Sequence, residues 1–267
     1  MKYFVFADVH GFYSILKNEL DNAGFDVNNE DHMLISIGDN FDRGPENYEM
    51  FLFLKEMKEK NKIILIKGNH EDLFMDMLRK GYPQSHDYTN RTYDTLLQFY
   101  RKYFNITDEE AEPSNWIEIY YKLKEDGFFD LIYDMKDYHE TNKYVFTHGF
   151  IPVSGIYNPF YNENCKYKIN WRDSSSQEFK ESRWYNGIEM SMKYNINEQN
   201  KKIVVGHFHS SYGNVRKALG KGLPKAKYKE YEFSEFEYFK PYEDDNIIAI
   251  DSCVAFTKRI NVIILED

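Results

Sequence analysis

Residues 1–11 read MKYFVFADVHG, a short apolar run followed at once by an aspartate, a histidine and a glycine. Residues 2–7 have the length and composition of one buried strand. Four later apolar runs also end in a polar cluster. They are residues 33–37 before Gly38-Asp39, 62–66 before Gly68-Asn69-His70, 143–147 before His148, and 203–205 before His207 and His209.

Helical patterns separate the first three of these strands. Residues 13–23 carry apolar side chains at helical spacing, and the amphipathic segment from Pro45 to about residue 60 begins where a proline is tolerated. A third helix follows Glu71. The order β-α-β-α-β-α in the first 80 residues predicts an α/β fold, a sheet layered with helices. Residues 247–250 and 261–265 are expected to complete the sheet.

Two segments do not follow this alternation of strands and helices. Residues 81–142 look helical and aromatic, with a boundary near Pro113, and predict an inserted helical subdomain. Residues 217–245 are first lysine-rich and then rich in Tyr, Phe and Glu, which favours a solvated hairpin or loop over a substrate-facing lid. No linker divides the chain, so we expect a single domain over residues 1–267.

Composition limits the possible partners. The net charge is −10, from 44 acidic and 34 basic residues, which argues against a nucleic-acid partner. An anionic substrate would be attracted locally, by metal ions or a few basic side chains. Two distant cysteines exclude a disulfide framework and a cysteine zinc site, and they suit the cytoplasm. We expect no signal peptide and no contact with a membrane.

The five polar clusters predict one metal centre, because the carboxyl ends of strands are where ligands gather in α/β sheets. Carboxylate, amide oxygen and imidazole donors without thiolate suit Mn, Fe or Zn. The candidate ligands are Asp8, His10, Asp39, Asn69, His148, His207 and His209. They are enough for two ions that share one carboxylate, and two such ions can hold a bridging hydroxide and clamp a phosphoryl group.

The motif series ADVHG (residues 7–11), GDNFDRG (38–44), KGNHE (67–71), HG (148–149) and GHFH (206–209) resembles that of calcineurin-like metallophosphoesterases. GDxxDRG followed by GNHE more narrowly resembles the phosphoprotein phosphatase branch, including small bacterial and phage serine/threonine phosphatases. The resemblance implies a β-sandwich of two mixed sheets flanked by helices.

The resemblance also implies how the metals are held. Asp39 would bridge two divalent cations, with manganese favoured over iron and zinc. Asp8 and His10 would hold the first ion, and Asn69, His148 and His207 the second. His209 departs from the phosphoprotein phosphatase branch and follows the GHxH pattern of the wider superfamily, in which this histidine completes the first metal.

The catalytic roles follow from the same resemblance. A metal-bridging hydroxide would attack phosphorus in line, without a phosphoenzyme. Arg43 would grip the phosphate, His70 would protonate the leaving alkoxide, and Asp42 would orient His70. Lys67 stands where relatives often have a second arginine. Arg172 fits the spacing of a further phosphate contact better than Arg183. Glu71 is interpreted only as a first-turn helix residue, and Asp251 as a structural acid outside the site.

The expected function is a phosphomonoesterase, first of all a serine/threonine protein phosphatase, with a phosphorylated protein or a small phosphoester as partner. Alternatives in the same superfamily are a diadenosine tetraphosphatase, a nucleotidase and a cyclic phosphodiesterase. A non-catalytic binding module would have lost His70 or metal ligands, and all are present. A nuclease is disfavoured by the acidic balance. The sequence does not indicate the oligomeric state.

Overall fold

The computed structural model describes residues 1–107, 116–155, 165–220 and 225–267. Its first sheet has the order β11-β1-β2-β3, in which β1 to β3 are parallel and β11 is antiparallel to β1. The strands are β1 (Lys2–Phe6), β2 (His32–Ser36), β3 (Ile63–Leu65) and β11 (Ile263–Glu266).

The second sheet has the order β4-β5-β8-β10-β9, with β5, β8 and β10 parallel and both edge strands antiparallel. Its strands are β4 (Tyr138–Glu140), β5 (Tyr144–Thr147), β8 (Lys202–Val205), β9 (Tyr242–Glu243) and β10 (Ile247–Ala249). A separate ribbon pairs β6 (Val153–Ser154) with β7 (Lys166–Tyr167). Two mixed sheets confirm the predicted α/β class.

Alternating side chains explain why the sheets pack face to face. In β1, Phe4 and Phe6 belong to the core beneath the helices, whereas Val5 points the other way. Val5 packs in a third apolar cluster that also contains Phe146 of β5 and Val204 of β8. Because successive side chains of a strand face opposite sides, an uninterrupted apolar strand must be covered on both faces. The sandwich follows from this requirement.

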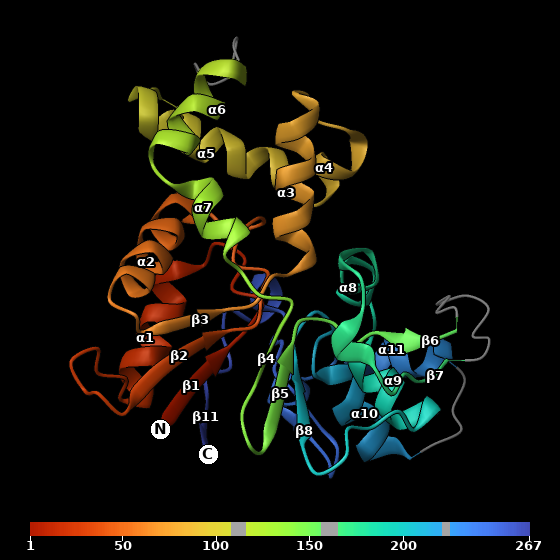
Figure 1. Ribbon diagram of the computed structural model, residues 1–267. Coiled ribbons are helices and arrows are strands. Elements are labelled where there is room, and N and C mark those ends of the chain that lie inside the picture. Colours follow the sequence, from red (N-terminus) through yellow and green to blue (C-terminus); the bar gives the residue numbers. More distant parts are fainter. Residues whose placement is uncertain (108–115, 156–164, 221–224) are drawn as a thin grey trace.

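Helices cover the outer faces of the sandwich (Figure 1). α1 (Tyr13–Ala23) and α2 (Asn47–Glu59) lie over the first sheet, and α9 (Gly187–Tyr194) and α10 (Ser211–Leu219) over the second. Five helices follow β3 in sequence and precede β4: α3 (Asn69–Lys80), α4 (Ser85–Thr89), α5 (Thr92–Phe104), α6 (Trp116–Glu125) and α7 (Phe128–Tyr133). The helix α8 (Ser176–Ser182) follows β7.

The helices α4 to α7 lie in the segment expected to be a helical subdomain. They stand with α3 beyond the carboxyl ends of the first sheet (Figure 1). Residues 81–142 also contain β4, which the sequence pattern does not predict. The predicted boundary at Pro113 lies outside the described residues. Whether this segment is a subdomain in its own right stays a prediction.

The prediction for residues 217–245 is wrong. This segment forms the end of α10, the helix α11 (Lys225–Glu232), a 3-10 turn at Phe236–Phe239, and β9. Tyr228 and Phe239 are buried, so part of the aromatic content packs inward and supports a regular structure. The short helix α12 (Val254–Thr257) precedes β11. Within the described residues, no helix is both long enough and apolar enough to cross a membrane.

Candidate active site

The strand ends of both sheets meet at one edge, and backbone hydrogen bonds join their loops. The Asp8 N–H donates to the Gly38 carbonyl at 3.0 Å, which connects the loops after β1 and β2. The Gly206 N–H donates to the His148 carbonyl at 2.9 Å, which connects those after β5 and β8. The polar residues therefore converge because the sheet topology places their loops side by side.

Six residues of these loops have a left-handed backbone. They are Asp8, His10, Asp39, Asp42, Arg43 and His207, with φ between 50° and 75°. Non-glycine residues avoid this region, and clusters of them occur where surrounding contacts fix a functional geometry. Gly206 shows how tight the packing is, because a Cβ there would overlap the carboxylate of Asp8. The backbone thus aims these side chains into the shared edge.

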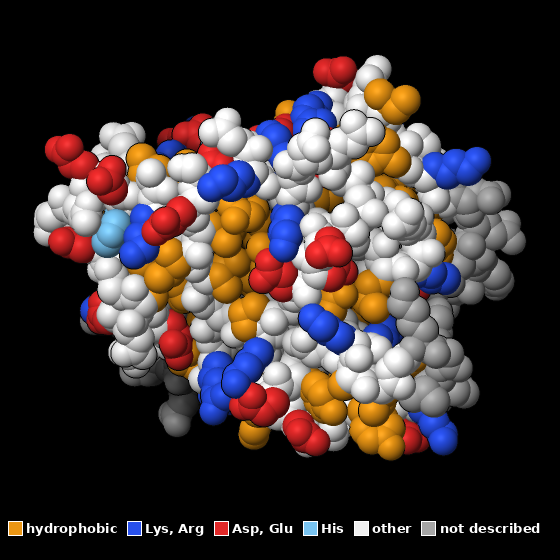
Figure 2. Space-filling model, turned by 90° about the horizontal axis from the view of Figure 1, so that it is seen from below, with side chains coloured by type: hydrophobic (Ala, Val, Ile, Leu, Met, Phe, Trp, Pro, Cys, Tyr) orange, Lys and Arg blue, Asp and Glu red, His pale blue; other side chains and the backbone are white. Residues whose placement is uncertain are grey.

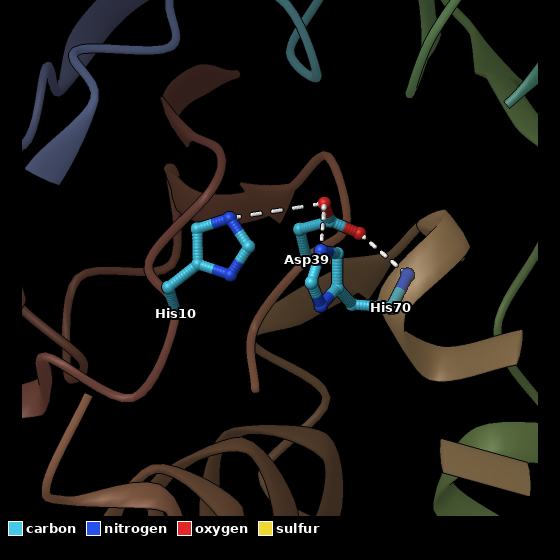
Figure 3. Close-up of side chains that lie close together, drawn as sticks. All are labelled: His10, Asp39 and His70. Atoms are coloured by element: carbon cyan, nitrogen blue, oxygen red, sulfur yellow. Dashed lines mark hydrogen bonds and ion pairs between the residues drawn. The ribbon is translucent and has the colours of Figure 1, made fainter. Parts of the chain in front are cut away.

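Two groups of side chains offer ligand atoms that lie within 4.8 Å of one another. His10, Asp39 and His70 form the first group, and Asp39, His148 and His207 the second. Figure 3 shows His10 and His70 on either side of the Asp39 carboxylate. Because Asp39 belongs to both groups, the arrangement suits two cations that share one carboxylate.

Hydrogen bonds set the tautomers of two histidines in this centre. The Nδ1 of His10 lies 3.0 Å from the Phe41 carbonyl, and the Nδ1 of His148 lies 2.7 Å from the Ile37 carbonyl. A carbonyl only accepts, so each Nδ1 carries the proton. In His10 the lone pair then lies on Nε2, 3.8 Å from Asp39, which is the tautomer that a metal ion needs. In His148, Nε2 lies 3.3 Å from Asp39 and holds a second proton when no metal is bound, and a bound cation would displace that proton.

The charges of the centre also fit a cation. Burial and the neighbouring Asp251 raise the pKa of Asp8 well above its usual value. Burial alone would lower the pKa of His148, but the Asp39 carboxylate raises it to about 9. Burial and the charge of His148 lower the pKa of His207 to about 3, so His207 is neutral and able to coordinate. A divalent cation would relieve the crowding of these buried carboxylates.

His70 is held by a buried carboxylate. Its Nδ1 lies 2.7 Å from Oδ2 of Asp42, which is fully buried. Burial opposes charge on His70, but Asp39 and Asp42 raise its pKa. Thr92 and Thr95 of α5 donate their hydroxyls to the two oxygens of Asp42 at 2.8 and 2.7 Å. A helix of the 81–142 segment therefore supports the pair.

Arg43 spans the top of the centre. Its two terminal nitrogens lie 2.8 Å from Nε2 of His10 and 3.0 Å from Nε2 of His70. A guanidinium only donates, so both Nε2 atoms accept. Arg43 as a whole is exposed, so its guanidinium donors lie beside the centre where an anion can reach them.

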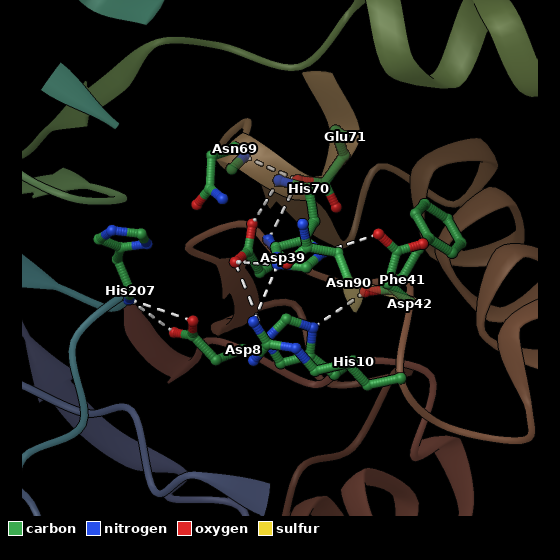
Figure 4. Close-up of polar contacts among 12 residues, drawn as sticks. Asp8, His10, Asp39, Phe41, Asp42, Asn69, His70, Glu71, Asn90 and His207 are labelled. Carbon is green, nitrogen blue, oxygen red and sulfur yellow. Dashed lines mark hydrogen bonds and ion pairs between the residues drawn. The ribbon is translucent and has the colours of Figure 1, made fainter. Parts of the chain in front are cut away.

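Most of the predicted site residues come together. Figure 4 shows Asp8, His10, Asp39, Asn69, His70 and His207 around one space. The Asn69 Oδ1 lies 2.9 Å from Nε2 of His148, and Asp8 accepts the backbone N–H of His207 at 3.0 Å.

Two predicted residues, His209 and Arg172, have partners outside the centre. Asp8 and His209 are both in neither ligand group, but Asp8 faces the centre (Figure 4), whereas the His209 Nδ1 is 3.0 Å from the Ser211 hydroxyl and its ring packs against Phe233. Arg172 forms ion pairs with Glu140, at 2.5 Å, and with Glu198.

Lys67 is half-buried. Burial and the nearby Arg183 guanidinium lower its pKa. Arg183 itself bonds to Asp72 and Asp137. Of the two arginines considered from the sequence, Arg183 is therefore the one near Lys67 and the start of α3.

Three residues matter to the site that the motifs did not assign. Glu71, buried at the start of α3, accepts backbone N–H groups of Asp39, Asn40 and Gly68 at 3.0, 2.8 and 2.7 Å. It joins the loops after β2 and β3, which is more than the predicted first-turn role. Thr92 and Thr95 carry no sequence signal, because they lie some 50 residues from Asp42.

Comparison with known proteins agrees with this geometry. Serine/threonine-protein phosphatase 2 of Escherichia coli K12 is 34% identical over 77 residues, which are 29% of this chain and 33% of that protein. Bis(5'-nucleosyl)-tetraphosphatase PrpE of Bacillus velezensis is 32% identical over 76 residues, 26% of this chain and 30% of that protein. The alignments span about a third of each relative's length.

The fold has a solved counterpart. The cold-active protein-tyrosine phosphatase of the psychrophile Shewanella sp. superposes with a TM-score of 0.51 at 16% identity, over 100% of this chain and 75% of that chain. A family model described as calcineurin-like phosphoesterase matches residues 1–237, from the first strand to beyond the last motif. The chain belongs to the calcineurin-like phosphoesterase family.

Proposed function

We propose that this chain is a dinuclear metal-dependent phosphomonoesterase that removes phosphate from serine and threonine residues of proteins. The pair of His70 and Asp42 is the observation that carries the proposal. An aliphatic alkoxide is a poor leaving group and needs a proton as its bond to phosphorus breaks. A histidine with a raised pKa, fixed by a buried carboxylate at the edge of the centre, can supply that proton.

The proposed metal ligands are Asp8, His10, Asp39, Asn69, His148 and His207. When bound, two divalent cations would supply an activated water and neutralise charge on the phosphate, with manganese favoured and iron or zinc as alternatives. Asp39 lies in both ligand groups and is the proposed bridge. His209 stays a predicted seventh ligand.

The other residues position the substrate and move the proton. Arg43 binds phosphate oxygens with the fork that now faces His10 and His70. With Arg43 turned to the phosphate, His70 in its protonated form passes its Nε2 proton to the leaving oxygen, while Asp42 holds Nδ1–H and stabilises the ring's charge. Lys67 adds a cation beside α3. A phosphate contact by Arg172 stays a prediction, and its ion pairs with Glu140 and Glu198 do not support it.

Hydrolysis of dinucleoside polyphosphates is the second candidate, because the aligned segment is similar to the tetraphosphatase PrpE as well as to protein phosphatases. A nucleoside phosphate is a much better leaving group than an alkoxide and has less need of an acid. The His70–Asp42 pair therefore favours the phosphomonoesterase.

A substrate panel on the metal-reconstituted protein tests the proposal. Phosphoserine and phosphothreonine peptides, diadenosine tetraphosphate, nucleotides and cyclic nucleotides are compared with each metal in turn. We expect the phosphopeptides to have the highest kcat/KM, and the Asp39→Asn protein to be inactive on every substrate. A higher kcat/KM for diadenosine tetraphosphate, or for a cyclic nucleotide, would contradict the proposal.

Replacing Thr92 and Thr95 with valine removes the hydroxyls that hold Asp42 at nearly constant side-chain volume. We expect kcat for a phosphoserine peptide to fall about tenfold, which corresponds to about one hydrogen bond to a charged group. The loss should be smaller for an aryl phosphate, whose leaving group needs less protonation. Thr89→Val on the exposed side of α4 is the matched control. An equal loss for both substrates would mean that the threonines do not act through Asp42.

A further inference from the structure

A groove leads away from the centre between α5 and the loop that follows Arg43. It has a volume of about 1020 Å³ and includes Arg43 itself in its lining. One face of α5 forms its wall, since the residues that line it recur at helical spacing. They include Arg91, Asp94, Gln98, Arg101, Lys102 and Asn105.

The groove is positive although the chain is acidic. Five cationic and three anionic side chains line it, whereas the whole chain carries a net charge of −10. On the opposite side of the molecule, where the termini lie, acidic and basic side chains are interspersed (Figure 2). The positive balance of the groove is opposite in sign to the charge of the whole chain, and it can attract an anionic segment of a substrate.

Two exposed lysines, Lys102 and Lys258, also line this groove. Lys102 pairs with Glu49 at 2.7 Å. Lys258, from the turn after α12, donates to the carbonyl of Ala255 at 2.8 Å and lies 4.9 Å from the ring of Phe12. Among the residues that the structure describes, no carboxylate forms an ion pair with Lys258, so its charge can pair with a carboxylate of a substrate.

The distances along α5 fit a polypeptide. Thr95 contacts Asp42, and Lys102 lies seven residues further, or about 10 Å along the helix. An extended chain covers that distance in about three residues. A substrate whose phosphate lies at Arg43 would therefore place the side chain about three positions away beside Lys102, and Lys258 lines the same groove.

The two aromatic rings that line the groove each have a lysine over them. The ring of Phe12 is approached by Lys258. The ring of Tyr48 packs edge-on against Phe99 at 5.6 Å and has Lys102 at 5.9 Å. The positive lining and the reach along α5 fit an acidic peptide segment.

We propose that this groove binds the chain of a phosphoprotein substrate on one side of its phosphorylated residue and selects acidic side chains about three positions away. The inference rests on the proposed protein phosphatase function and adds the class of substrate sequence. Lys102 and Lys258 are the specificity residues, and neither contacts the reacting phosphate.

Pairs of phosphoserine peptides test this proposal. The two peptides of a pair differ only in having acidic or neutral residues two to four positions from the phosphoserine, and one pair is made for each side of the phosphoserine. We expect wild-type kcat/KM to be about fivefold higher for an acidic peptide, the scale of two exposed ion pairs. The Lys102→Gln/Lys258→Gln protein should lose this preference and keep its activity on an aryl phosphate. Salt at about 0.5 M should also remove the preference by screening.

Lys60→Gln at the far end of α2 is the matched control, because Lys60 is also exposed and ion-paired. A preference that survives in the double variant, or that Lys60→Gln abolishes equally, would overturn the groove assignment while the proposed function stands. A double variant impaired only on diadenosine tetraphosphate would assign the groove to dinucleotides instead. Failure of the wild type on both peptides, with aryl phosphate still hydrolysed, would overturn the proposed function itself.

Discussion

The His70→Ala protein is expected to lose turnover of phosphoserine peptides by about 10²–10⁴-fold, the usual contribution of a general acid. The reason is that Nε2 of His70 faces the centre while Nδ1 is bonded to Asp42. The loss should be smaller for an aryl phosphate, because its leaving group departs without a proton. Single-turnover rates on both substrates, with metal content measured on the same samples, check this result.

The metal measurement matters because His70 lies within ligand distance of His10 and Asp39. If His70 were a ligand, its removal would empty the first site and reduce both activities alike. If it is the acid, the metal content stays unchanged. His86→Ala, which removes an exposed histidine of α4, is the matched control for the loss of an imidazole. Loss of metal in His70→Ala would contradict the acid assignment.

Asp39→Asn is expected to abolish activity and to weaken metal binding at least about a hundredfold, beyond the effect of losing an outer-shell partner. The substitution keeps the shape of the side chain but removes its charge. Asp39 belongs to both ligand groups, so both ions should be affected. Its Oδ1 also accepts the backbone N–H of His70 at 2.9 Å, which positions the start of α3.

Calorimetric titration of the metal-free protein measures this effect. Asp21→Asn, which removes an exposed carboxylate of α1, is the matched control. Loss of one ion with normal binding of the other would show that Asp39 does not bridge. His209→Ala in the same titration tests the remaining predicted ligand, because an unchanged affinity for two ions would reject its role.

The segment between α3 and β4 contains none of the sequence motifs, but its helix α5 forms hydrogen bonds to residues of the site. α5 supplies the threonines that hold Asp42, and Gln98 of the same helix accepts the backbone N–H of Asn47 at 2.9 Å and donates to the Gly44 carbonyl at 2.9 Å. The opposite end of the wall formed by α5 carries Arg101 and Lys102. One helix can therefore link the geometry of the proton donor to the choice of substrate, so mutations along α5 should affect either kcat or peptide preference according to their position.

The sequence by itself determined the α/β fold and the identity of the motif residues. Both depend on local order: a strand that is apolar on both faces must be covered on both, and the residues directly after it must lie at the sheet edge. The same rule predicted that Asp8, Asp39 and His148 would meet.

Only the tertiary structure decided which distant side chains complete the site. Thr95 donates a hydrogen bond to Asp42, 53 residues away in the sequence, and Arg172 forms an ion pair with Glu140 instead of facing the centre. The described residues between 225 and 245 form α11, a 3-10 turn and β9, because buried rings such as Phe239 pack against the body of the protein, although their composition resembles a solvated loop. Such contacts depend on how separate elements are packed, and no spacing within one segment encodes them.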